Sequence, residues 1–148
     1  MTTQSLLCYT SVGGIEANYN GSGQSFTLEQ YTKVENFTAD GVSVGGVVPD
    51  YANGKVTVTD GGVYEVHMHM SVSSGTANVI VHCAVFSDGV EQSLETERKI
   101  SAAGDVGSWS MSSPLTLSAG DEVDIRMNPD KTATLTVAHC QFWLKRIT

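Results

Sequence analysis

Residues 55–72 read KVTVTDGGVYEVHMHMSV, and this stretch decides the fold class. Two runs within it, residues 56–59 and residues 63–72, alternate from one side chain to the next, and Asp60-Gly61-Gly62 joins them. Alternation with a period of two is the pattern of a β-strand buried on one face, because successive side chains point to opposite sides. We therefore predict two strands here.

The two faces of the second run differ in chemistry. The apolar face, which we predict to lie in the core, carries Tyr64, Val66, Met68, Met70 and Val72. The opposite face carries Glu65, His67 and His69, three titratable groups in a row. This face meets either water or another subunit, and which of them it meets decides the functional interpretation.

From residue 25 onward the chain repeats this pattern of short strands and tight turns. Asn53-Gly54 predicts a hairpin, because both residues tolerate positive φ. Residues 77–86 are almost continuously apolar, which is typical of a strand covered on both sides. Residues 92–100 could form two helical turns, but they also alternate, and we predict a strand. Eight to ten strands at this spacing indicate a sandwich or a barrel.

The first 24 residues lack this periodicity and are rich in small polar side chains. We predict an N-terminal arm over residues 1–24, with an edge strand near residues 6–10 and a flexible link, followed by one β domain over residues 25–148. Leu6, Leu7 and Tyr9 are too apolar for a solvated tail. They are either a first strand of the domain or a docking segment for a partner.

The bulk properties exclude several classes of protein. The 148 residues carry a formal net charge of −8 with eight dispersed Lys and Arg, which argues against a nucleic-acid partner. The N-terminus lacks the basic region of a secretory signal, and no apolar run is long enough to span a bilayer, so we expect synthesis in the cytoplasm and no membrane partner. Cys8, Cys83 and Cys140 are widely spaced, and we expect buried, reduced thiols.

Three histidines are candidates for a metal site. His67 and His69 lie two apart on one strand, and His139 lies on the last strand. The spacing from Gly61 to His69 resembles the start of the cupin metal motif, but residues 73–75 are Ser-Ser-Gly where that motif needs a Glu. We expect solvated or interface histidines, no cofactor and no enzyme activity; a cupin-like metal enzyme using His67, His69 and His139 is the alternative.

Three segments, in order, resemble the jelly roll of the tumour-necrosis-factor and complement-globular-head superfamily. They are VTVTDGGVYEVHMHM at residues 56–70, LTLSAGDEVDI at residues 115–125 and CQFWLKRI at residues 140–147. The resemblance covers about residues 34–147. Phe142 stands where that superfamily usually has a small residue, so the packing at this position should differ.

The resemblance implies an all-β jelly-roll β-sandwich of two antiparallel sheets that assembles as a homotrimer, with one sheet facing its neighbours. If that sheet holds residues 63–72 and the last strand, the side chains at the trimer interface are Glu65, His67, His69, His139, Gln141 and Trp143. We expect these six residues to lie on one face.

Members of the superfamily with a short arm and no leader look like decoration, head-fibre or tail modules of bacteriophage virions. The resemblance therefore implies a non-enzymatic structural or adhesive protein of a virion, although a fold does not by itself fix a function. We expect attachment to capsid or tail proteins through Leu6, Leu7 and Tyr9, with a host surface glycan as a further partner.

Overall fold

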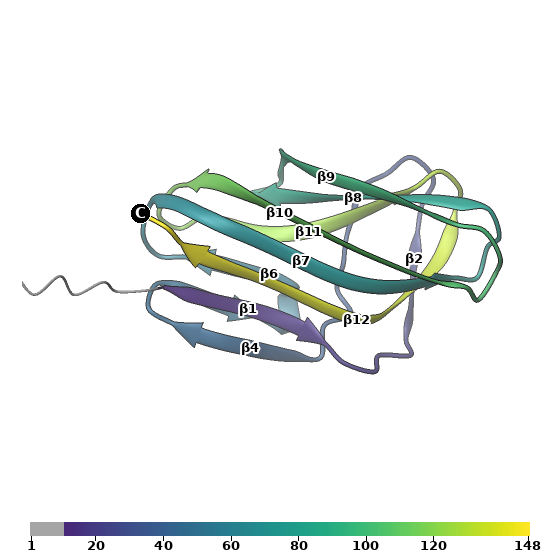
Figure 1. Ribbon diagram of the computed structural model, residues 1–148, viewed down its shortest axis with the longest axis horizontal. Helices are drawn as coiled ribbons and strands as arrows, with labels where there is room; N and C mark the ends of the chain where they lie inside the picture. Colours follow the sequence, from purple (N-terminus) through teal and green to yellow (C-terminus); the bar gives the residue numbers. More distant parts are fainter. Residues whose placement is uncertain (1–10) are drawn as a thin grey trace, which may run out of the picture.

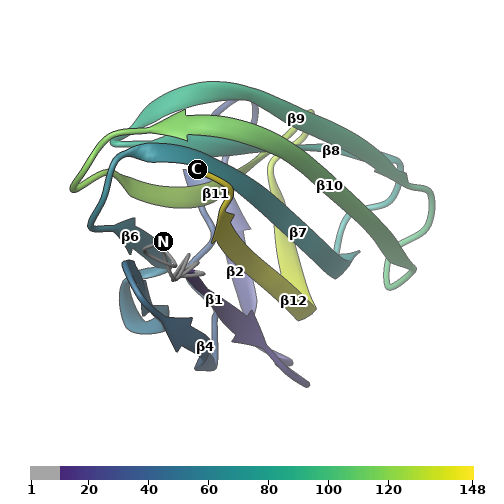
Figure 2. The ribbon, with the colours of Figure 1, turned by 60° about the vertical axis from the view of Figure 1, so that its left-hand side comes forward.

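The computed structural model describes residues 11–148, which form two antiparallel β-sheets packed face to face (Figure 1). Sheet A has the strand order β10-β7-β12-β1-β4, and β2 also pairs with β12. Sheet B has the order β5-β6-β11-β8-β9, and β3 also pairs with β11. Figure 2 shows the strands of sheet A succeeding one another from β10 to β4. This is the predicted all-β jelly-roll sandwich.

The strand bounds are as follows. Sheet A contains β1 (Val12–Ala17), β2 (Gly23–Phe26), β4 (Ala39–Val44), β7 (Gly62–Ser74), β10 (Val106–Leu117) and β12 (Ala133–Arg146). Sheet B contains β3 (Thr32–Lys33), β5 (Val47–Asp50), β6 (Lys55–Val58), β8 (Val79–Ser87), β9 (Val90–Ile100) and β11 (Glu122–Pro129). A single 3₁₀ turn, η1 (Tyr51–Asn53), joins β5 to β6. Within the described part of the chain, no helix is long and apolar enough to cross a membrane.

The core lies between the two sheets, and β7 contributes the face that its alternation predicts. Its five apolar side chains are all buried: Tyr64, Val66, Met68, Met70 and Val72. The Tyr64 hydroxyl donates a hydrogen bond to the carbonyl oxygen of Asp60 at 2.7 Å, so this buried polar group is satisfied. Phe142 on β12 is also fully buried, so its larger ring packs between the sheets. The face assignment of β7 is confirmed.

Other local predictions also hold. Strands β5 and β6 form an antiparallel hairpin, in which η1 ends at Gly54 with a left-handed φ of 60°. Residues 92–100 belong to strand β9 and not to a helix. Cys83 and Cys140 are buried free thiols. The Asp60-Gly61-Gly62 link joins the two strands as expected and carries the chain from β6 in sheet B to β7 in sheet A.

The predicted flexible link in the second half of residues 1–24 is wrong. Strand β1 lies inside sheet A, paired with β12 on one side and β4 on the other, and Ile15 and Ala17 are in the core. A Cβ atom at Gly14 would lie only 2.5 Å from the Cβ of Trp143, so this position must be glycine. That glycine removes the alternation by which the strand could be recognised. Residues 1–10, with Leu6, Leu7 and Tyr9, lie outside the described residues.

Candidate interaction face on sheet A

The six predicted interface residues lie together on the outer face of sheet A, the face turned away from the core. They are Glu65, His67 and His69 on β7, and His139, Gln141 and Trp143 on β12. The register of the two strands places His67 opposite Trp143 and His69 opposite Gln141. The structure therefore brings these residues side by side across two strands.

A β-bulge in β12 decides where His139 points. The pairing with β7 shifts between Val137 and His139, so that Val137 is buried whereas His139 is exposed. In a regular strand these two residues would share a face, because they are two positions apart. The extra residue of the bulge puts His139 on the outer face while Val137 stays in the core.

Trp143 is the largest side chain of this face. Its ring lies flat against the ring of His67, with 3.9 Å between the ring centres and 10° between the planes. The Nε2 atom of His67 lies 3.6 Å from a carboxylate oxygen of Glu65, too far for a hydrogen bond, and it has no other partner among the described residues. The stacked pair forms a flat, half-buried platform.

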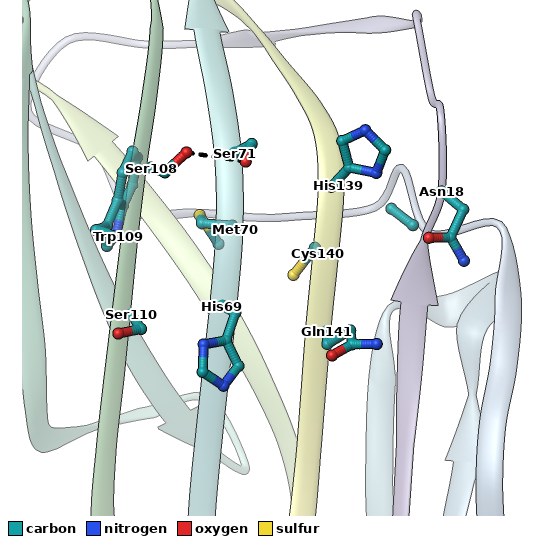
Figure 3. A pocket seen from close by; sticks show the side chains of 11 residues that line it. Asn18, His69, Met70, Ser71, Ser108, Trp109, Ser110, His139, Cys140 and Gln141 are labelled. Carbon is teal, nitrogen blue, oxygen red and sulfur yellow. Dashed lines mark hydrogen bonds between the residues drawn. The ribbon is translucent and has the colours of Figure 1, made fainter.

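A groove of about 500 Å³, here the polar groove, crosses β10, β7 and β12 on the same face. Figure 3 shows the side chains that line it, with Asn18 following the end of β1. Its polar lining consists of Asn18, His69, Ser71, Ser108, Ser110, His139 and Gln141. The hydroxyl oxygens of Ser71 and Ser108 are 3.0 Å apart and hydrogen-bonded. The groove offers several hydrogen-bond donors and acceptors.

A second groove of about 390 Å³, here the apolar groove, lies between β4, β1 and β12. Its lining includes Val12, Gly14, Gly41, Val42 and Trp143. The two glycines leave the backbone of β1 and β4 bare, and the Trp143 side chain forms one wall. The two grooves meet at Gln141, which lines both.

The charged side chains are unevenly divided between the two outer faces. On sheet B they come from β3, β5, β6, β9 and β11: Lys33, Asp50, Lys55, Glu91, Glu95, Glu97, Lys99, Glu122, Asp124 and Arg126. On sheet A, within residues 11–148, they are Glu16, Glu65 and Lys145, together with Asp40 at the edge strand β4, whose carboxylate accepts a hydrogen bond from Tyr51 N at 2.8 Å. The outer face of sheet A is therefore poor in charge.

The histidines do not form the metal site of the cupin alternative. Among the residues that the structure describes, no group of three or more His, Cys, Asp or Glu could hold a metal ion. The His67 ring stacks on Trp143, whereas the His139 ring contacts the edge of Tyr19, with 4.8 Å between the ring centres. The three histidines therefore lie on one face, but their rings do not converge on a position that one metal ion could occupy.

Two components of this face were not predicted from the sequence. The serines of β10 line the polar groove, and Gly14 and Gly41 form the floor of the apolar groove. The alternation SWSMS at residues 108–112 could have revealed the serines, because it places them opposite the half-buried Trp109 and the buried Met111. The sequence holds no signal that relates Gly14 to Gly41.

Comparisons with known proteins bear on the fold. The Eiger TNF of S. frugiperda superposes with a TM-score of 0.65 at 11% identity, covering 93% of this chain and 94% of that one. The chain has a TNF-like jelly-roll fold. Murine APRIL gives a TM-score of 0.63 at 16% identity over 92% and 98% of the two chains. The globular domain of zebrafish complement 1qA gives 0.58 at 18% identity over 93% and 98%.

The similarity lies in structure and not in sequence. The sequence matches no protein-family model and no curated protein. Identities of 11–18% support a shared fold alone. The superfamily resemblance seen in the sequence is thus confirmed as a resemblance of fold.

Proposed function

We propose that this protein is a non-enzymatic, trimeric structural or adhesive component of a bacteriophage virion, and that its subunits meet through the outer face of sheet A. The observation that carries the assembly is the uneven distribution of charge. Protein interfaces are depleted in charged residues at their centre and enriched in aromatic ones. The outer face of sheet A meets both conditions, and the outer face of sheet B does not.

Trp143 is the proposed anchor of the interface. Large aromatic side chains contribute most to the energy of association when they are surrounded by contacts that exclude water. Trp143 is on β12, the middle strand of sheet A, where it forms one wall of the apolar groove and lies flat against the His67 ring. The serines and glycines around it leave room for a neighbouring subunit to approach. The TNF-like fold supports a three-fold arrangement through the superfamily resemblance, which implies a homotrimer.

The virion location is a separate part of the proposal from the assembly. It is supported by the same resemblance and by the apolar segment that contains Leu6, Leu7 and Tyr9, which we assign to attachment on capsid or tail proteins. In this account the protein is made in the host cytoplasm and assembled onto the particle. The test of this location is peptide mass spectrometry on purified particles of a phage whose genome encodes the chain. The absence of peptides of this chain from the particles would refute the location.

The adhesive part of the proposal concerns a host surface glycan, which would bind to a surface that the assembled trimer leaves exposed. The polar groove does not have this role, because His69, His139 and Gln141, which line it, belong to the proposed subunit interface. A glycan array probed with the labelled trimer tests the adhesive part, and the absence of any bound glycan would refute it.

The assembly is tested by sedimentation of the full chain. We expect a particle of three times the 15.7 kDa chain mass. Ser110→Arg places a charge on the outer face of sheet A, and we expect it to dissociate the particle, because an unpaired charge is costly in an interface. Ser93→Arg makes the same change on exposed β9 of sheet B and should leave the assembly intact.

The results separate two errors. A wild-type monomer would refute the trimer itself. A trimer that tolerates Ser110→Arg would refute the choice of face, and one that Ser93→Arg dissociates would place the interface on sheet B. Circular dichroism of both variants establishes that they remain folded.

A further inference from the structure

The apolar groove exposes more hydrophobic surface than a solvated face requires. It is built on the free edge of sheet A, because β4 pairs with β1 on one side and has no further strand of the described chain on the other. Val42, which lines the groove, is 64% exposed, and Val44 on the same strand is 50% exposed. Exposed apolar patches of this kind mark binding grooves.

Within residues 11–148, the edge strand β4 also lacks the usual protection against pairing. Natural edge strands carry lysine, proline or a cover of other chain segments. Strand β4 reads ADGVSV and contains neither lysine nor proline, and the carboxylate of its one acidic residue, Asp40, is bonded to Tyr51 N. An extended apolar segment suits this place when it lies over the groove itself, with its side chains packed between Val42 and Trp143.

The chain itself contains such a segment. Residues 1–10 read MTTQSLLCYT, without a charged side chain, and residues 6–9 are their apolar part. They join the described domain at Ser11, directly before Val12 of the groove. Ser11 is a fixed point: its carbonyl oxygen accepts a hydrogen bond from Arg146 N at 2.8 Å, and its hydroxyl accepts one from Gly46 N at 3.1 Å.

The direction of the chain at Ser11 favours the groove of a neighbour. The bond to Arg146 continues the pairing of β1 with β12, so Ser11 extends the line of β1 beyond Val12. The groove extends the opposite way, over residues 12–16. A segment entering its own groove would have to reverse within the two or three residues before Ser11. Residues 6–10, when extended, span about 17 Å from Ser11, which suffices for the groove of a subunit that adjoins this end of β1.

We propose that residues 6–9 of one copy lie in the apolar groove of a neighbouring copy, between Val42 and Trp143. This arm exchange rests on the proposed trimer and adds a second contact to it. It buries Leu6, Leu7 and Tyr9 in the free protein. Attachment to a virus particle through the same side chains would then compete with the groove.

A disulfide test uses the cysteine that the segment already contains. Val42→Cys places a thiol in the groove, and mild oxidation by oxidised glutathione should join it to Cys8. Cys83 and Cys140 do not compete, because both are buried, and burial raises the pKa of the Cys140 thiol to about 12. On non-reducing gels we expect covalent species of two and three chains in most of the protein.

Matched variants identify the bond. Val48→Cys carries a thiol at a 45% exposed valine of β5 in sheet B and should give no linked chains. Val42→Cys combined with Cys8→Ser should also give none. Val44→Cys, on the same strand as Val42, provides a second position, and linked chains from either groove variant support the proposal.

Three outcomes would overturn the arm exchange. In the Val42→Cys variant, a disulfide from Cys8 to the introduced thiol of the same chain, identified by peptide mass spectrometry after mixing isotopically labelled and unlabelled protein, would show that the segment occupies its own groove. Absence of linked chains from both groove variants, with the trimer intact in sedimentation, would refute the exchange and leave the proposed trimer standing. A wild-type monomer in sedimentation would instead refute the trimer, and the exchange with it.

Discussion

Replacing Asp124 by Asn should destabilise the fold through one partly buried charge cluster. Asp124 is on β11 and only 3% exposed, although it faces outward from sheet B. Arg126 covers it, donating from Nε at 2.8 Å and from Nη2 at 3.3 Å, and Lys33 Nζ lies 3.6 Å away. The guanidinium of Arg126 also lies 4.4 Å from the centre of the Phe86 ring.

The magnitude follows from the burial of each partner. Hydrogen bonds to charged groups contribute about 1.5–3 kcal/mol each, and removing one partner of a fully buried pair costs about 3–5 kcal/mol. The Arg126 and Lys33 side chains are 24% and 30% exposed, so water screens part of the attraction. Asn keeps one acceptor oxygen. We expect Asp124→Asn to lower the free energy of unfolding by about 1–3 kcal/mol.

The assay is urea unfolding in a double-mutant cycle with Arg126→Gln, at one fixed protein concentration because assembly shifts apparent stability. We expect a coupling energy of about 1–2 kcal/mol between the two positions. Glu97→Gln is the control, since the Glu97 side chain is 65% exposed, and it should change stability by less than about 0.5 kcal/mol. A coupling below about 0.3 kcal/mol would refute the assignment of stability to this pair.

Three further changes have definite expected results. Val66→Asp puts a carboxylate at a fully buried position and should cost several kcal/mol, so soluble folded protein on gel filtration would contradict the face assignment of β7. Gly14→Val should prevent folding, because its Cβ would clash with Trp143 on the paired strand. Gly21→Ala is the control: nothing lies within 4 Å of the added Cβ, so this variant should melt like the wild type. Equal melting temperatures of the two variants would show that β1 can shift. Iodoacetamide at about pH 8 should label Cys83 and Cys140 only in urea. Burial raises the pKa of both thiols and keeps them protonated in the fold, whereas an unfolded thiol ionises near this pH. Labelling of these two cysteines in the native protein, mapped by mass spectrometry, would contradict their burial.

The uneven charge of the two faces connects the fold to the proposed assembly. In a sandwich that stays a monomer, both outer faces meet water, and charged side chains are expected on both sheets. The charged cluster around Asp124 stabilises sheet B in contact with solvent. On sheet A the corresponding positions hold small polar side chains and the platform of His67 and Trp143.

The sequence alone determined the fold class and the faces of the long strands. The alternation of residues 63–72 identifies the buried side of β7, because the two-residue period is a property of the backbone that needs no partner. The same argument placed Gln141 and Trp143 on the outer face of β12. The hairpin at Asn53-Gly54 was equally local, since positive φ at Gly54 depends on that residue's own backbone.

Only the tertiary structure decided how those faces combine into a site. Strand β1 is recognised only in the structure. Its glycine, Gly14, pairs with Trp143 of β12, a residue far away in the sequence, and the close approach of the two strands requires that glycine. The bulge before His139 and the joining of Gly14 to Gly41 in one groove likewise depend on which strands pair and in what register. Asp124 alternates as an exposed residue but is buried, because Arg126 and Lys33 cover it. Register is set by contacts between distant segments, and a pattern read along one segment does not contain it.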